Sequence, residues 1–311
     1  MYDKFPANFI SGKRAANSVS CHPMKKKIFL SLFVFFSCLL ATAQDKSALN
    51  VMTFNIRFNN PRDSANAWPN RKDFAASQIL FHEAHIIGVQ EALHEQLLDL
   101  EKRLVHYRWL GVGRDDGKTR GEYSAVFYDS SRLQALRSET LWLSETPNVV
   151  GSKGWDAALP RIVTWVLFRD RVTKKQFYLF NTHFDHIGKE ARRSSAELIL
   201  KKVKEIAGNA PAIITGDFNA KPADEPVQVL VNAANPLKLT NSQFLSKQAH
   251  YGPTGTFNAF GAKEVNNEPI DYIFLKGNFD VLQHATLSQT WGGRFSSDHF
   301  PVFARLVILK N

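Results

Sequence analysis

The chain has 311 residues, of which 44% are hydrophobic and 22% are charged, and its formal net charge is +10. This length suffices for one large domain or two ordinary ones. No repeat, low-complexity tract or linker interrupts residues 49–309, which excludes a repeat architecture and favours one domain. The excess of Lys and Arg forms no dense stripe, which argues against a surface that tracks a long nucleic-acid duplex.

Residues 24–43 have the three regions of a secretory signal peptide. Three lysines follow Met24, an apolar run occupies residues 28–40, and Ala-Thr-Ala follows at residues 41–43. We expect cleavage after Ala43. The apolar run is too short for a comfortable membrane span, so we expect no transmembrane segment in the mature chain.

This interpretation divides the chain into an N-terminal extension plus signal peptide at residues 1–43 and a mature domain at residues 44–311. Met24 is the expected initiator, because a signal peptide normally opens a chain. The mature domain is then secreted or periplasmic. The alternative is a lipoprotein signal with Cys38 lipidated, although Phe35, three residues earlier, fits that signal poorly.

Cleavage after Ala43 changes both the cysteine count and the charge. It removes both cysteines, Cys21 and Cys38, so the mature chain has no disulfide and depends on its core for stability. The removed segment carries six Lys or Arg residues and one Asp, which leaves a net charge of about +5. An excess this mild favours a phosphate-bearing substrate only weakly.

Residue patterns predict alternating strands and helices along the mature chain. Apolar runs and two-residue alternation predict strands at residues 49–56, 86–89, 124–128, 140–143, 162–168, 176–182, 212–215, 270–275, 281–288 and 302–309. Helical periodicity predicts helices at residues 71–85, 94–104, 189–207 and 225–232, with Gly208 ending the third. Residues 236–262 are predicted to be mostly loop.

Two polar residues follow the predicted strand at residues 212–215. Gly216 is expected to end that strand, and Asp217 and Asn219 then stand two positions apart. A carboxylate and a carboxamide held at the end of a buried strand suit the positioning of a water molecule. The alternative is an Asx-turn in which both side chains bond to nearby backbone.

Other predicted strands have similar polar residues at their ends. These residues are Asn55, Glu91, His183 with Asp185, and Asp298 with His299. Solvent exposure alone does not explain why these residue types recur at strand ends. A metal-assisted hydrolase needs the same residue types together in one site.

The order of short motifs TFNIR, VQE, NTHFDH, GDFN, IDYIF and SDHFPV resembles the endonuclease/exonuclease/phosphatase superfamily over residues 49–309. The resemblance implies an α/β fold, a four-layer sandwich of two packed mixed β-sheets flanked by helices. It also implies hydrolysis of phosphate esters with a divalent cation. Mg²⁺ is expected, with Mn²⁺ or Ca²⁺ as alternatives.

The resemblance assigns roles to the acidic and amide side chains. Glu91 is the expected metal ligand, with Asp298 and Asn55 beside it, and Asn55 also lies near the scissile phosphate. Asp217 and Asn219 are left to orient and deprotonate the attacking water. The general base is either Asp217 or the second histidine, at position 299.

Roles for the two histidines also come from the resemblance. His299 is oriented by Asp271, which favours a charged imidazolium beside the phosphate. His183 donates to a phosphoryl oxygen, and Glu122 is its expected orienting partner. For Glu122 the alternative is an ordinary acidic residue on an edge strand.

Three further residues are candidates for substrate binding. Arg57 replaces an Asp found in some relatives, which suggests a guanidinium for the phosphate; a solvated Arg is the alternative. Arg161 precedes a strand and is a candidate to contact the phosphate; a structural ion pair is the alternative. Asp185 extends the loop after the histidine at position 183 and, together with His186, shapes the pocket.

These observations predict a secreted phosphoesterase for a small molecule or a lipid headgroup. Nucleic acid is a possible substrate but not the preferred one, so a secreted endonuclease is the alternative within the class. An inactive binding module on the same fold is the alternative from another class. The protein is expected to be a monomer.

Overall fold

The computed structural model describes residues 47–261 and 267–309, within one compact unit that spans Lys46–Asn311. The predicted signal peptide, its cleavage site and both cysteines lie outside the described residues. No helix in the described ranges combines the length and apolar character needed to cross a bilayer.

The first sheet contains six strands in the order β11-β12-β1-β2-β4-β3. Their bounds are β1 (Leu49–Asn55), β2 (Ile86–Ala92), β3 (Tyr107–Leu110), β4 (Tyr123–Asp129), β11 (Phe279–Thr286) and β12 (Val302–Ile308). Strands β1 and β2 pair in parallel, and the other neighbours pair antiparallel. The sheet is therefore mixed.

The second sheet repeats this plan, with the strand order β5-β6-β7-β8-β10-β9. Its strands are β5 (Leu133–Trp142), β6 (Ile162–Asp170), β7 (Gln176–His183), β8 (Ala212–Asp217), β9 (Thr240–Asn241) and β10 (Asp271–Lys276). Here β7 and β8 form the parallel pair, while the remaining neighbours are antiparallel. The predicted pair of mixed sheets is confirmed.

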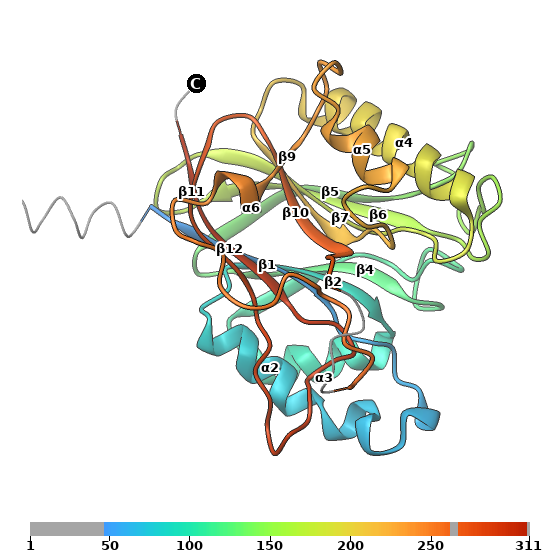
Figure 1. Cartoon of the computed structure of the whole chain (residues 1–311), viewed down its shortest axis with the longest axis vertical. Helices are drawn as coiled ribbons and strands as arrows, with labels where there is room; N and C mark the ends of the chain where they lie inside the picture. The colour runs from blue at the N-terminus through green and yellow to red at the C-terminus, as the bar shows by residue number, and fades with distance from the viewer. Residues whose placement is uncertain (1–46, 262–266, 310–311) are drawn as a thin grey trace, which may run out of the picture. The chain divides into compact units, whose positions relative to one another are not determined.

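Helices cover the outer face of each sheet (Figure 1). The first sheet carries α2 (Lys72–Phe81) and α3 (His94–Arg103), and the second carries α4 (Lys189–Ala207) and α5 (Glu225–Val231). Shorter segments are the 3₁₀ helices η1 (Pro61–Asn66) and η2 (Trp68–Asn70) and the single turn α6 (Ser242–Leu245). The resulting order of layers is helix, sheet, sheet, helix, as expected.

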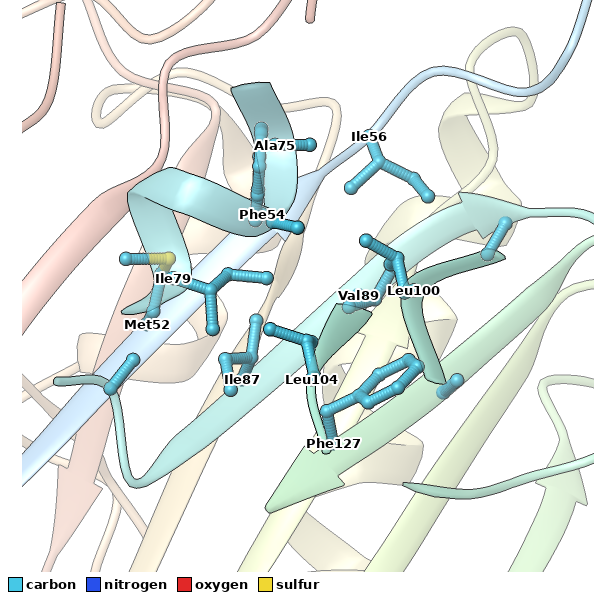
Figure 2. Packing of buried hydrophobic residues seen from close by; sticks show 14 of the residues in the cluster. Met52, Phe54, Ile56, Ala75, Ile79, Ile87, Val89, Leu100, Leu104 and Phe127 are labelled. Atoms are coloured by element: carbon cyan, nitrogen blue, oxygen red, sulfur yellow. The ribbon is translucent and has the colours of Figure 1, made fainter. Parts of the chain in front are cut away.

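Alternate residues of each central strand face the helices. Met52 and Phe54 of β1 and Ile87 of β2 pack against Ile79 of α2 and Leu104 directly after α3, and all five are fully buried (Figure 2). Burying a side chain of this size stabilises the fold by roughly 1.5–3 kcal/mol relative to exposure. Because alternate side chains of a strand point to the same face, one face of each central strand packs against the helices.

The opposite face of the same strands points into the layer between the sheets, and its character changes along the strands. Val51, Ile86, Leu179 and Ile213 form part of an apolar cluster at one end. Buried polar side chains follow further along the strands: Thr53, Gln90, Asn181 and Thr215. The next positions on that face carry Asn55, His183 and Asp217, so strand periodicity alone delivers these three side chains to one place.

Several boundaries differ from the predicted ones. Strand β8 continues through Gly216 to Asp217, so the glycine does not end it. A Cβ at Gly216 would lie 2.6 Å from the Thr182 carbonyl oxygen, which explains the glycine as a close approach between β7 and β8. Helix α2 ends at Phe81, four residues before the predicted end, because the chain turns at Glu83 with φ of 47°.

Candidate active site

The second sheet places three site residues side by side. Asp217 ends β8, and the strand register pairs it with His183 of β7 on one side and Asp271 of β10 on the other. All three are buried. Neighbouring strands lie about 4.8 Å apart, so this register places an imidazole and a second carboxylate on either side of Asp217.

The first sheet contributes Asn55 and Glu91 from its parallel pair. Asn55 Nδ2 donates to Glu91 Oε1 and to Asp217 Oδ2, both at 3.0 Å. One carboxamide therefore joins the two sheets at the site. Glu91 Oε2 also accepts the Phe58 N–H at 3.2 Å.

A β-bulge gives Glu91 its orientation. The register of β2 against β4 shifts between Val89 and Ala92, and Glu91 has a φ of 62°. In regular alternation position 91 would face the helices, as Ile87 and Val89 do. The bulge instead turns the carboxylate toward Asn55, which is a common use of bulges beside active sites.

Asp298 and His299 lie on the segment that leads into β12. The Ser297 hydroxyl donates to the Asn55 carbonyl at 2.7 Å and fixes this segment against β1. The guanidinium of Arg71, which is buried, holds the same region by donating to the carbonyls of Ile56 (2.9 Å) and Ser296 (2.6 Å). Arg71 thus supports both loops of the first sheet that carry site residues.

These residues surround a cavity of about 550 Å³. Six of the predicted residues line it together: Glu91, His183, Asp217, Asn219, Asp298 and His299. Arg57, Arg161 and Glu122 line the same cavity, and so do Phe58, Leu159, His186, Phe257 and Ile270. Residues separated by more than 200 positions in the sequence therefore meet in one site.

Burial raises the pKa of Asp217 to about 7, and the charge of the adjacent Asp271 adds to this effect. His299, the N–H of Asn219 and the amide of Asn55 act in the opposite direction. Asn219 N donates to Asp217 Oδ1 at 2.9 Å. A carboxyl with a pKa near 7 exchanges protons efficiently at neutral pH.

His299 has the opposite protonation behaviour. Burial alone lowers the pKa of His299, but the charges of Asp271 and Asp217 outweigh burial and raise it well above the usual value. His299 Nδ1 lies 2.8 Å from Asp271 Oδ2, which also accepts the Thr256 hydroxyl at 2.6 Å. Asp271 thus contacts His299 as the sequence predicts, and the imidazolium form is favoured.

His183 is held as a neutral imidazole. Burial lowers the pKa of His183 well below its usual value, and the charges of Arg161 and Arg114 lower it further. Asn219 Nδ2 lies 3.0 Å from His183 Nε2 and donates to the Phe184 carbonyl at 3.1 Å. An amide nitrogen only donates, so His183 Nε2 acts as an acceptor in the free protein.

The donor set fits a divalent cation. Glu91, His183 and Asp217 each place one potential ligand atom within 4.8 Å of the others. The Arg57 guanidinium lies between two of the predicted ligands, 3.8 Å from Glu91 Oε2 and 3.7 Å from Asp298 Oδ2. Glu91 and Asp298 therefore flank the same space, and carboxylate and carboxamide oxygens are the ligands that Mg²⁺ prefers.

The predicted substrate-binding residues differ in how they are engaged. Arg57 lines the cavity and makes its closest ion pair with Asp63, at 3.1 Å. Arg161, only 4% exposed, lines the cavity but donates through Nε to Asp185 Oδ1 at 3.2 Å. Asp185 is buried behind Arg161 and accepts three backbone N–H groups, so its carboxylate organises the pocket wall.

Glu122 lines the cavity, and both of its carboxylate oxygens accept from Arg114, at 2.7 and 2.9 Å. A smaller cavity of about 10 Å³ lies between Glu122, Arg114, Arg161 and His183. This volume is about that of one water molecule. Glu122 is thus bonded to Arg114, and its predicted role in orienting His183 stays a prediction.

Sequence reasoning missed several residues of the site. Arg71 was assigned only to the start of a helix, and its bonds to carbonyl groups some 15 and 225 residues away leave no local pattern. Leu159 and Phe58 line the cavity without belonging to the strand-end pattern. Their proximity to Arg161 and Arg57 in the sequence is the one signal that was available.

Two packed mixed sheets that bring acidic, amide and histidine side chains together in one cavity indicate a hydrolase that uses acid/base chemistry. A model of the endonuclease/exonuclease/phosphatase family matches residues 52–299, and the chain belongs to that family. Members of this family hydrolyse phosphate esters.

Solved structures and a curated relative support this assignment. A family member from Bacteroides vulgatus shares 41% identity, with 84% of this chain and 99% of that chain covered and a TM-score of 0.81. A mannosyl-6-phosphatase from Bacteroides thetaiotaomicron shares 39% identity over 84% of this chain and all of that one, with a TM-score of 0.79. Nocturnin from Drosophila melanogaster is 21% identical, and the match covers 79% of this chain but 43% of nocturnin.

Proposed function

We propose that the protein is a secreted, divalent-metal-assisted phosphoesterase that hydrolyses phosphate esters of small molecules. The observation that carries the proposal is the cavity lined by Glu91, Asp217, His299 and their neighbours from both sheets. The likeness to a mannosyl-6-phosphatase supports a small phosphorylated substrate. The signal-like pattern at residues 24–43 supports secretion.

Glu91, Asp298 and Asn55 would hold the cation, which supplies neutralisation of charge on the phosphoryl oxygens and on the leaving oxygen. Mg²⁺ suits this oxygen-rich set, and Mn²⁺ or Ca²⁺ are the alternatives. The Arg57 guanidinium, placed between Glu91 and Asp298, adds positive charge for the phosphate.

Asp217 receives the proton of the attacking water in this proposal. Its raised pKa suits proton transfer at neutral pH, and the Asn219 N–H and Asn55 Nδ2 fix its carboxylate. His299, charged beside Asp271, stabilises the negative charge that develops on the phosphoryl group. To act as the base, His299 would first have to lose its proton, so the pKa shifts of the two groups support Asp217.

His183 is neutral in the free protein and accepts from Asn219. A phosphate dianion beside it would favour protonation, after which Nε2 can donate to a phosphoryl oxygen. His183 therefore changes hydrogen-bond direction when substrate binds. This exchange is the structural basis that we propose for its role.

Three alternatives compete with this proposal. A secreted endonuclease would use the same chemistry on nucleic acid, and lipid-headgroup hydrolysis would differ in the surrounding loops. An inactive binding module would lack central catalytic residues, whereas this chain retains Glu91, His183, Asp217, Asp298 and His299.

A substrate panel tests the proposal. Bis(p-nitrophenyl) phosphate, p-nitrophenyl phosphate, plasmid DNA, sphingomyelin, inositol phosphates and hexose 6-phosphates are each incubated with the protein, with Mg²⁺ or with EDTA. We expect Mg²⁺-dependent turnover of the small esters. Turnover of none of them in the presence of Mg²⁺, Mn²⁺ or Ca²⁺ would favour the binding module, and preferential cleavage of DNA would favour the endonuclease.

A further inference from the structure

One wall of the cavity is built by a rigid network that the proposed chemistry does not use. Asp185 accepts the backbone N–H groups of Ala158 (3.1 Å), Ile187 (3.0 Å) and Gly188 (2.8 Å). These bonds tie the loop before β6 to the loop after β7. They also hold the pKa of Asp185 well below its usual range, against the raising effect of burial. The carboxylate is therefore ionised and fixed.

Asp185 in turn orients Arg161, and Arg161 orients His186. Arg161 Nε donates to Asp185 Oδ1 at 3.2 Å, and Arg161 Nη2 lies 2.9 Å from His186 Nδ1. A guanidinium nitrogen only donates hydrogen bonds, so His186 Nδ1 must accept. The proton of this neutral ring is then on Nε2, which is left as a donor.

His186 differs from the other histidines of the site in its exposure. Its side chain is 48% exposed and lines the cavity, whereas His183 and His299 are buried. A half-exposed ring that is held by a buried Arg–Asp pair is pre-organised to meet a ligand, since little side-chain freedom is lost on binding.

The surroundings of His186 indicate which ligand would fit. The charges of Arg161 and Asp185 balance, as do those of Arg114 and Glu122, so this wall offers hydrogen bonds without a large net charge. Leu159, Phe257 and Ile270 add apolar surface to the same cavity. A second phosphate group would need unpaired cations here, whereas a neutral ring with hydroxyl groups matches both the donors and the apolar surface.

We propose that His186 Nε2–H donates to a hydroxyl group of the leaving alcohol, and that the substrate is the phosphate ester of a polyhydroxylated small molecule of the sugar class. This inference rests on the proposed phosphoesterase function. His186 is the contact residue, and Arg161 is a positioning residue that holds the ring and fixes its tautomer. Specificity is then set by His186, apart from the carboxylates that are proposed to hold the metal.

The test compares two substrates that differ in hydroxyl groups on the leaving alcohol. Hexose 6-phosphates carry them and p-nitrophenyl phosphate does not. In His186→Ala we expect kcat/KM for hexose 6-phosphates to fall about tenfold more than kcat/KM for p-nitrophenyl phosphate, mainly through KM, which is the usual scale for one lost hydrogen bond to substrate. His186→Gln, whose amide both accepts and donates, should restore most of the loss.

The matched control is Ile187→Ala, because the neighbouring Ile187 side chain is 64% exposed and its backbone N–H is unchanged. It should alter neither substrate's kinetics.

Equal losses for both substrates in His186→Ala, or no recovery in His186→Gln, would overturn the role of His186. Turnover of p-nitrophenyl phosphate without turnover of any hexose 6-phosphate would overturn the substrate class while leaving the phosphoesterase intact. Turnover of neither would count against the proposed function itself.

Discussion

Asp217 connects the two sheets at the level of single residues. Its carboxylate accepts from Asn55 of the first sheet and from the N–H of Asn219 after β8. We expect Asp217→Asn to lower kcat by at least about 10², the usual scale for losing a positioned proton acceptor. The measurement is kcat for a small phosphate ester at saturating Mg²⁺, with circular dichroism as the control for folding. Near wild-type turnover would remove Asp217 from the mechanism.

Asp271 is expected to act through His299. In Asp271→Asn the pKa of His299 should fall, because the charge that outweighs burial has been removed. A raised folded-state pKa stabilises the native state fully below the unfolded value of about 6.5, and this stabilisation disappears as the pH rises through the folded-state pKa. NMR titration of the His299 ring in both proteins measures the shift. An unchanged pKa would mean that Asp271 only fills space.

At the scale of elements, Asn181 of β7 lies between the sheets, next to the site. Its Nδ2 donates to the carbonyls of Val89 and Ala125, both at 2.9 Å, and its Oδ1 accepts from Gln90 Nε2 at 2.6 Å. These bonds hold the strand that carries His183 against the strand that carries Glu91. The inter-sheet register therefore depends partly on one buried carboxamide.

Asn181→Ala should lower the free energy of unfolding by about 1–3 kcal/mol, since buried partners are left without hydrogen bonds. Turnover should fall as well, because Glu91 and His183 lose their fixed separation. Urea denaturation measures the first effect. Gln134→Ala, at an exposed position on β5, is the control and should stay within about 0.5 kcal/mol of wild type. A loss of stability no larger than this control's would contradict the assigned role.

His284 makes β11 sensitive to acid. Burial lowers the pKa of His284 to about 3, and the charge of His250, whose Nδ1 lies 2.9 Å away, adds to this effect. The unfolded chain then binds more protons between about pH 6.5 and 3, so stability falls as pH falls through that window. The slope from one group is up to about 1.4 kcal/mol per pH unit.

His284→Gln should reduce this slope, measured as the unfolding free energy at pH 7, 5.5 and 4.5. The reduction is partial because burial also lowers the pKa of His85, to about 4, which acts in the same direction. A wild-type slope in His284→Gln would show that other groups control acid sensitivity.

How well the sequence predicted each element depended on burial. Helix α4 was predicted with the bounds that the structure has, because its apolar face and Gly208 give strong local signals. Strand β3 was missed, and of β5 only the last residues were predicted. Half of the residues of β5, an edge strand, are solvent-exposed, so it lacks the alternation that burial imposes. The segment predicted to be mostly loop at 236–262 contains the short elements β9 and α6, which have too few residues to carry a periodic pattern.

At the scale of the whole molecule, six predicted site residues were found together because strand ends carry recognisable short motifs. The backbone distortion and the hydrogen bonds that orient these side chains were not predictable from such motifs. The bulge that turns Glu91 and the long-range bonds of Arg71 depend on tertiary packing, which leaves no periodic trace in the sequence. Local pattern thus identified the side chains, while packing determines their orientation.

The distribution of charge leads to the last prediction, on substrate size. Three of the six cations of α4 pair with acids on the same helix: Lys201 and Lys202 with Glu205, at 3.9 and 2.9 Å, and Arg193 with both Glu190 and Glu197, at 2.5 Å. Exposed pairs of this kind form a solvated face. They do not form a track for many phosphates.

A duplex bound through many phosphates loses affinity steeply with salt, whereas an ester held by one phosphate, the metal and Arg57 has a shallow dependence. We therefore expect initial rates on a small ester to change less than about threefold between about 50 and 200 mM salt, with plasmid DNA a poor substrate throughout. Rates on both substrates over this range are the measurement. Efficient DNA cleavage that falls by orders of magnitude with salt would instead identify a nuclease, because only a polyanion releases enough counterions to produce that slope.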